Sequence, residues 1–328
     1  MKVISIDLGG TKIAGAVFDI SGVMLEKKEK LLNGLGGDEV GDLINELIKE
    51  FLQSGDHNDV NCIGICVPGI SYSKSGKVWA PNIPGWEDYP LKSKIKNFLG
   101  DKNINIHIES DRTCYILGEV WQGVAKECLN AIYLAVGTGI GAGILLDGNI
   151  IHGASDIVGA TGWMALQTPY REEYIPMGCF EYYASGNGIA RYAQELLRRE
   201  KIKEKNEEKI ETLLLKKEID EITSYDVFDA YSKNDIIATR VIDKAIEMWG
   251  MGTANLVSLF NPEKIIFGGG VFGPAVMFIE KIYKEACKWG QPISMKQVEF
   301  CASGIKGDSA LLGAAYLAIR ENKKINNI

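Results

Sequence analysis

The residues best suited to chemistry near the start of the chain surround a pair of glycines. An apolar run at residues 3–6 ends at Asp7, residues 9–11 read Gly-Gly-Thr, and a second apolar run covers residues 13–18. This pattern predicts a strand, a tight turn and a strand. Adjacent glycines let the backbone approach a bulky group, so turn N–H groups and Thr11 could hold phosphate, and Asp7 could hold Mg²⁺ through water. An ordinary hairpin with a Gly-Gly turn fits the same residues.

A second copy of this pattern lies at residues 131–148, AIYLAVGTGIGAGILLDG. Its alternating glycines resemble a dinucleotide-binding fingerprint, but that motif requires a helix after the glycines. Here a further apolar run leads into Asp147-Gly148, which is a hairpin signal. We therefore reject the dinucleotide fold. One strand–turn–strand unit in each half of the chain predicts a duplicated domain with nucleotide between the halves.

Asp111 is the next candidate for chemistry. An expected strand at residues 104–108 precedes it, and an expected helix at residues 113–122 follows it. A carboxylate at this point lies at the carboxyl edge of the sheet, where open α/β folds bind ligands. Residues alone also allow Asp111 to be only the N-cap of the helix.

Composition limits the classes of function. The chain has 328 residues, 46% of them hydrophobic, and a net charge of −7. This length favours two domains, and without a basic block we expect no nucleic acid partner. No apolar run reaches the length of a membrane span, so we expect no membrane association. Seven scattered cysteines without framework spacing predict reduced thiols in the cytoplasm.

The remaining pattern is that of an α/β protein. Apolar periodicity predicts helices at residues 39–52, 182–200, 236–260 and 310–322, and strands at 62–67 and 264–267. Residues 68–86 are expected to form a long loop with a possible hairpin. The charged segment 201–221 is expected to be a solvated helical face. A three-glycine turn, Gly268-Gly269-Gly270, could pack under a base or ribose.

In this order, the motifs resemble those of the repressor–ORF–kinase (ROK) family of sugar kinases, in the actin/hexokinase/Hsp70 superfamily. The resemblance covers nearly the whole chain, through to the closing helix that begins near Ala310. It implies phosphate-binding residues Asp7, Gly9, Gly10, Thr11 and Lys12 in the first motif, Gly137, Thr138 and Gly139 in the second, and Gly268, Gly269 and Gly270 in the nucleoside segment.

The resemblance also implies fold, cofactors and mechanism. We expect duplicated actin-like, ribonuclease H-like α/β domains with a cleft between them. The small domain would comprise residues 1–112 plus a helix at about 310–328, and the large domain residues 113–309. ATP and Mg²⁺ would bind in the cleft, with Mg²⁺ on Asp7 through water. Asp111 would be the general base that takes the proton of a sugar hydroxyl as the hydroxyl oxygen attacks the γ-phosphorus. We also expect a homodimer.

Acceptor-binding residues follow from the same resemblance, with departures. They are Gly69, Asn82, Ser110, Asp111, Ala160, Trp163 and Glu181. Ser110 stands where the family has Asn, and Ala160 and Trp163 stand where the family has a glutamate and a histidine. The family's zinc loop has kept only Cys179, with Trp163, Glu172 and Tyr174 at the other ligand positions. A structural zinc needs about four N or S ligands, so we expect no zinc and a loop held by packing of Tyr170, Tyr174 and Phe180.

Three classes of function remain. A kinase for a hexose-like sugar is favoured, with a cyclitol or amino sugar as the alternative acceptor. A sugar-responsive repressor would need an N-terminal helix-turn-helix, for which the strand at Val3 is expected to leave no room. A non-catalytic sugar- or nucleotide-binding protein would fit the altered acceptor residues. Ala160 and Trp163 favour an acceptor that differs from plain glucose.

Overall fold

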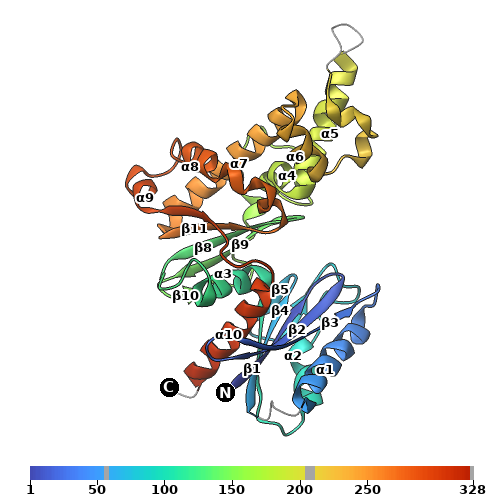
Figure 1. Ribbon diagram of the computed structural model, residues 1–328, viewed down its shortest axis with the longest axis vertical. Coiled ribbons are helices and arrows are strands. Elements are labelled where there is room, and N and C mark those ends of the chain that lie inside the picture. Colours follow the sequence, from blue (N-terminus) through green and yellow to red (C-terminus); the bar gives the residue numbers. More distant parts are fainter. Residues whose placement is uncertain (55–58, 204–210, 326–328) are drawn as a thin grey trace.

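The computed structural model describes residues 1–54, 59–203 and 211–325, and two five-stranded sheets organise them (Figure 1). The first sheet has the order β3-β2-β1-β4-β7. Its strands are β1 (Lys2–Leu8), β2 (Lys12–Asp19), β3 (Met24–Leu31), β4 (Val60–Val67) and β7 (Asn105–Ser110). β1 pairs antiparallel with β2 and parallel with β4, and β4 pairs parallel with β7. The expected hairpin around Gly9 and Gly10 is therefore confirmed.

The second sheet repeats this arrangement, with the order β10-β9-β8-β11-β12. Its strands are β8 (Ala131–Val136), β9 (Ile140–Leu146), β10 (Asn149–Ile150), β11 (Lys264–Gly268) and β12 (Glu299–Ala302). β8 pairs antiparallel with β9 and parallel with β11, as β1 does with β2 and β4. Each half thus has a hairpin next to parallel strands, which confirms the predicted duplication.

Helices cover both faces of the first sheet. Alternation along β1 sends Ile4 and Ile6 to one face and Val3 to the other. On the first face, α1 (Gly37–Gln53) and α2 (Leu91–Leu99) complete a core with Trp86. On the other face, α10 (Ser309–Ile325) packs on β1 and β4. The expected long loop contains a small hairpin, β5 (Ile70–Tyr72) with β6 (Lys77–Trp79).

The second sheet carries the larger core. It includes α4 (Cys179–Ala184), α5 (Gly186–Lys203), α6 (Ser224–Ser232), α7 (Ile236–Phe260) and α8 (Ile279–Ala286), and α9 (Pro292–Gln297) packs on α7. α3 (Asp111–Gln122) covers the opposite face, where Ile116 packs with Tyr133 and Ile266. α3 also packs on α10, so this helix lies between the two sheets (Figure 1).

Two helical expectations were wrong in detail. The predicted helix at residues 182–200 is two helices, because the chain is extended at Ser185 between α4 and α5. The charged segment after it forms short 3₁₀ turns at Leu213–Lys216 and Ile219–Glu221 instead of a long helical face; residues 204–210 lie outside the described ranges. Within the described residues, no helix combines the length and apolarity needed to cross a bilayer.

Glycines allow α10 to approach its neighbours at backbone distance. A methyl group on Gly64 of β4 would lie 1.8 Å from the Ala314 carbonyl oxygen, and one on Gly313 would lie 1.7 Å from that of Cys114. The Ser5 hydroxyl of β1 donates to the Leu311 carbonyl oxygen at 2.6 Å. These contacts fix α10 against the first sheet and α3 against α10.

We predict that Gly64→Ala destabilises the protein by about 3 kcal/mol, because the added methyl would collide with backbone and overpacking of this kind strains the core. Urea unfolding at pH 7.5 measures the change. Gly273→Ala is the matched control, because its methyl would make only a 3.4 Å contact, with the Gly270 carbonyl oxygen. Equal midpoints for the two variants would show that α10 does not need this close approach.

Candidate active site

Asp111 stands where β7 meets α3. Ser110 is the N-cap of α3 in extended conformation, and Asp111 is the first helical residue, so Asp111 is not the cap itself. One carboxylate oxygen of Asp111 accepts a hydrogen bond from the Arg112 N–H at 2.7 Å. Burial raises the pKa of Asp111 above its ordinary value. A raised pKa brings a carboxylate closer to the range in which a general base works best.

Asp7 occupies the same edge of the first sheet. It pairs in register with Cys66 of β4, and Cys66 pairs with Glu109 of β7, two residues before Asp111. Burial raises the pKa of Asp7 to about 6, against a hydrogen bond from the Cys66 thiol that lowers it. The Asp111 charge raises the pKa of Asp7 further, which shows that the two carboxyl groups are electrostatic neighbours.

The first glycine turn lies beside these carboxylates. The Gly9 N–H donates to the Lys12 carbonyl oxygen at 2.9 Å and closes the turn, while Thr11 is exposed. The Lys12 ammonium pairs with Glu29 at 3.0 Å. A methyl group on Gly10 would lie 3.6 Å from Asn82 Cβ. The structure therefore brings this turn next to one of the expected acceptor residues.

The second glycine turn opens into a cavity of about 700 Å³. Of the expected nucleotide residues, Gly137, Thr138 and Gly270 line it. The other lining residues are Gly186, Asn187, Ala190, Arg191, Gln194, Ile222, Thr223, Ser224, Tyr225, Phe228, Val271 and Pro274. A methyl group on Gly137 or Gly270 would meet nothing within 4 Å, so both glycines border open space. A cavity of this size with a glycine rim fits a nucleoside and its phosphates.

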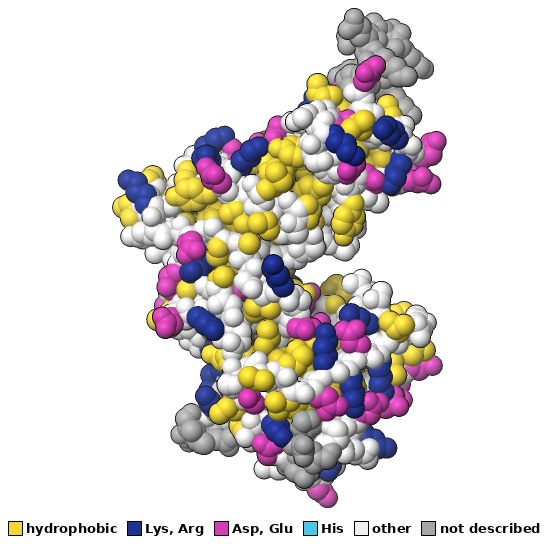
Figure 2. Space-filling model, in the orientation of Figure 1, with side chains coloured by type: hydrophobic (Ala, Val, Ile, Leu, Met, Phe, Trp, Pro, Cys, Tyr) yellow, Lys and Arg dark blue, Asp and Glu magenta, His cyan; other side chains and the backbone are white. Residues whose placement is uncertain are grey.

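The other expected nucleotide residues do not line this cavity. Gly268 and Gly269 lie against β8, where methyl groups would lie 1.8 Å from the Tyr133 hydroxyl oxygen and 2.5 Å from the Val136 carbonyl oxygen. These two glycines allow β11 to pack closely on β8. Gly139 borders Glu181, and the turn between Asp7 and Lys12 belongs to the first sheet. On the face shown in Figure 2, the molecule is hollowed between its two halves.

Glu181 is the best-anchored of the expected acceptor residues. It lies in the first turn of α4 and accepts a hydrogen bond from the Ile140 N–H at 2.7 Å. Burial raises the pKa of Glu181, while this bond and the Arg191 charge lower it. Methyl groups on Gly139 and Gly162 would lie 2.7 and 2.8 Å from its carboxylate. The carboxylate therefore ties the second glycine turn to the segment that contains Ala160 and Trp163.

Other expected acceptor residues surround the same region. Gly69 follows β4, and a methyl group there would lie 2.0 Å from the Trp79 carbonyl oxygen. Asn82 is exposed in the loop after β6. Ala160 precedes a 3₁₀ turn at Thr161–Trp163, and the Trp163 side chain is 56% exposed. Trp163 thus presents an open aromatic face.

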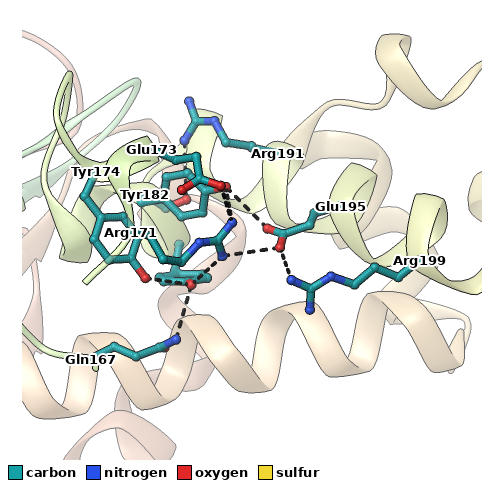
Figure 3. Close-up of polar contacts among 9 residues, drawn as sticks. Gln167, Arg171, Glu173, Tyr174, Tyr182, Arg191, Glu195 and Arg199 are labelled. Carbon is teal, nitrogen blue, oxygen red and sulfur yellow. Dashed lines mark hydrogen bonds and ion pairs between the residues drawn. The ribbon is translucent and has the colours of Figure 1, made fainter. Parts of the chain in front are cut away.

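An arginine and three tyrosines hold the loop that stands in place of the family's zinc loop (Figure 3). Arg171 donates to the hydroxyls of Tyr183 at 3.1 Å and Tyr182 at 3.3 Å, and the Tyr174 and Tyr183 hydroxyls are 2.9 Å apart. Tyr174 and Phe180 are buried, as predicted, whereas Tyr170 is 69% exposed and contacts Tyr174 only by its edge. Packing and charged hydrogen bonds therefore fix the segment before α4 and Glu181.

Metal-binding groups are scarce in the described ranges. No three His, Cys, Asp or Glu side chains there are grouped to hold a metal ion. Mg²⁺ commonly binds one or two carboxylates together with phosphate oxygens and waters. The expected role of Asp7, beside the first glycine turn, in such a site stays a prediction. The absence of zinc stays a prediction.

Sequence reasoning missed several residues of this region. Arg171 and Tyr183 gave no signal, because a lone arginine and a core tyrosine are common outside active sites. Arg191 of α5 lines the cavity, and its place one turn after Asn187 was the available clue. Arg112 follows Asp111 directly in the sequence. Because Asp111 is the expected base, this position could have predicted that Arg112 lies near the site.

Comparisons with known proteins agree with this geometry. The model of the ROK family matches residues 3–321. A glucokinase from Halalkalibacterium halodurans is 30% identical over 98% of this chain and 96% of its own length. A xylose repressor from Caldicellulosiruptor bescii is 29% identical, over 90% of this chain and 70% of its own length. The crystal structure of a ROK family glucokinase from Streptomyces griseus with glucose and AMPPNP superimposes with a TM-score of 0.72, at 26% identity, covering 98% of this chain and 100% of that one.

We predict that Asp7→Asn stabilises the protein by about 2–3 kcal/mol at pH 8. The carboxyl group has its ordinary pKa, 3.8, when unfolded and about 6 when folded. The folded state therefore loses stability from this group as pH rises from about 4 to 6, and the full penalty applies above 6. Asparagine carries no such penalty. Thermal unfolding of both proteins without Mg²⁺ should show the difference at pH 8 and roughly half of it at pH 5. A difference that grows toward pH 5 would show that burial does not raise this pKa.

Proposed function

Because this chain belongs to the ROK family, we propose that it is an ATP-dependent carbohydrate kinase that phosphorylates a hydroxyl of a hexose-like sugar or sugar derivative. The observation that carries the proposal is Asp111, whose carboxylate lies at the junction of β7 and α3 with a pKa raised by burial. A cyclitol or an amino sugar is the alternative acceptor.

Asp111 would act as the general base. Its carboxylate would take the proton of the acceptor hydroxyl as the oxygen attacks the γ-phosphorus of ATP, and the bond from that phosphorus to the β–γ bridging oxygen would break. The Arg112 N–H bond at 2.7 Å would hold one oxygen of this carboxylate in place while the group receives the proton. Most of the catalysis in such reactions comes from positioning and charge stabilisation.

The nucleotide would occupy the 700 Å³ cavity. Gly270 and Val271 would lie beside the nucleoside, and the N–H groups around Gly137 and Thr138 would hold phosphate. The first glycine turn, Gly9 to Lys12, would reach the phosphates from the other side of the cleft. Asp7 would hold Mg²⁺ through water, and the ion would neutralise charge that develops on the phosphates.

We also propose that the chain has two domains, is located in the cytoplasm and forms a homodimer. Residues 1–112 with the closing helix would form the small domain, and residues 113–309 the large one. Polar contacts that join them include Glu109 with His152 and the Ser73 N–H with Asp156. All seven cysteines are free, which suits the cytoplasm. In the proposed homodimer, exposed apolar side chains such as Leu259 and Trp289 would be covered.

A non-catalytic role as a sugar-responsive regulator is the second candidate. It is favoured by the similarity to a xylose repressor and by the altered acceptor residues Ala160 and Trp163. Such a protein would bind sugar without turnover. An assay for ADP release across a panel of sugars separates the two candidates.

We predict that Asp111→Asn lowers kcat by at least about 10²-fold, because an amide cannot accept the hydroxyl proton. Nucleotide affinity should change less than about twofold, since Asp111 does not line the cavity. Coupled-enzyme kinetics and calorimetric titration with AMPPNP measure the two quantities. Asp243→Asn, at an exposed position of α7, is the carboxylate-to-amide control. Turnover of Asp111→Asn equal to that of the control would exclude this residue as the base.

We predict that glucose is not the best acceptor. Ala160 cannot accept a hydrogen bond from a sugar hydroxyl, and an unsatisfied buried hydroxyl costs roughly 1–3 kcal/mol. The Trp163 face suits a less hydroxylated edge of the ring. Steady-state kinetics over aldohexoses, amino sugars and cyclitols, with identification of the product, give the order of kcat/KM. The double variant Ala160→Glu, Trp163→His should raise activity toward glucose. A wild-type protein that prefers glucose over every other acceptor would refute this prediction.

A further inference from the structure

Arg112 is a cation with no protein partner beside the acceptor region. It is the second residue of α3, directly after Asp111, and its side chain is half-buried. Methyl groups on Gly159 and Gly141 would lie 3.3 and 3.6 Å from Arg112 Cδ. The aliphatic part of the side chain thus runs across β9 toward the residue that precedes Ala160. Among the residues that the structure describes, none makes a hydrogen bond or ion pair with its guanidinium.

The carboxylates nearest to Arg112 are already engaged. Glu109 pairs with His152 and accepts from the Ser110 N–H at 3.2 Å. Asp111 accepts from the Arg112 backbone N–H. Both carboxylates act on the Arg112 charge electrostatically, but neither forms an ion pair with it within 4.0 Å. The five N–H donors of this half-buried guanidinium are therefore available to an acceptor from outside the protein.

On the opposite side of the region, the Glu181 carboxylate is already engaged. Gly159 is held to β9 by the hydrogen bond from the Ala142 N–H at 2.8 Å, and Ala160 follows with only a methyl side chain. Glu181 is bound to the Ile140 N–H, and the charge that lowers its pKa comes from Arg191. In the first turn of α3 and the facing segment 159–163, Arg112 is the cation and Asp111 the only carboxylate among the described residues.

We propose that Arg112 binds an anionic substituent of the acceptor, so that the substrate is a hexose derivative carrying a carboxylate or a phosphate. A guanidinium forms paired hydrogen bonds with either oxyanion. This inference rests on the proposed sugar kinase activity and names the class of its substrate. An acceptor with a free ammonium group would be repelled, so an unacetylated amino sugar is disfavoured.

The γ-phosphate of ATP is the other anion that Arg112 could contact. The cavity assigned to the nucleotide contains an arginine of its own, Arg191 of α5, and Arg112 does not line it. The two arginines therefore provide a matched comparison. Arg112 should determine the choice of acceptor, and Arg191 the affinity for nucleotide.

The kinetic test uses the full-length protein with ATP and Mg²⁺. The neutral acceptors are glucose and N-acetylglucosamine, the cationic one is glucosamine, the carboxylates are glucuronate and N-acetylmuramate, and the phosphates are glucose 1-phosphate and N-acetylglucosamine 6-phosphate. We expect the highest kcat/KM for a carboxylate or a phosphate acceptor. Comparison of the carboxylate acceptors with the phosphate acceptors identifies which of the two groups Arg112 binds. Arg112→Gln should lower that value about 10–10²-fold, mainly through KM, while Arg112→Lys should retain part of it.

Binding without turnover separates this inference from the kinase proposal. Calorimetric titration of each acceptor into protein with AMPPNP should show a carboxylate or phosphate acceptor bound by the wild type and weakened about 10–10²-fold by Arg112→Gln. That result supports the inference even if no sugar is phosphorylated. A lack of phosphorylation would refute only the kinase proposal.

Two outcomes would overturn the inference. One is stronger binding of a neutral acceptor than of every anionic one. The other is a rise in the Kd for AMPPNP in Arg112→Gln that matches the rise in Arg191→Gln, because Arg112 would then serve the nucleotide. Thermal unfolding of each variant verifies that it is folded.

Discussion

The close approach of α10 to β4 and α3 is the constraint on which the site depends. Gly64 and Gly313 leave no room for a side chain between these backbones. α10 therefore sets the distance from the first sheet to α3, and α3 begins with Asp111. Because β1 and β7 belong to that same sheet, Asp7 and Asp111 meet at one edge. The geometry of the two carboxylates is thus a result of helix packing at some distance from them.

Much of this arrangement could be predicted from sequence because its signals are local. A glycine turn between apolar runs specifies a hairpin, and a second copy indicates duplication. The place of Asp111 followed from one strand and one helix that adjoin in sequence. Its role as first helical residue instead of cap did not follow, because Ser110 and Asp111 are both good caps and only the backbone conformation distinguishes them.

What could not be predicted depends on contacts between distant residues. The break between α4 and α5 at Ser185 lies within a continuous apolar pattern, so the sequence gives no sign of it. At the start of α5, the Gly186 N–H donates to the Gly137 carbonyl oxygen of the second glycine turn at 2.8 Å. The hydrogen bonds from Arg171 to Tyr182 and Tyr183 link segments that are not periodic. The freedom of Arg112 is likewise a property of its surroundings, since nothing in its neighbours along the chain shows that Glu109 is taken by His152.

The cavity of 700 Å³ and the acceptor candidates have no residue in common within the described chain. Arg191, which lines the cavity, acts electrostatically on the acceptor candidate Glu181. Substitutions at Ala160, Trp163 or Arg112 therefore change no side chain that lines the cavity. Such separation makes a fold evolvable, since a lineage can exchange one acceptor for another while the phosphoryl donor stays the same.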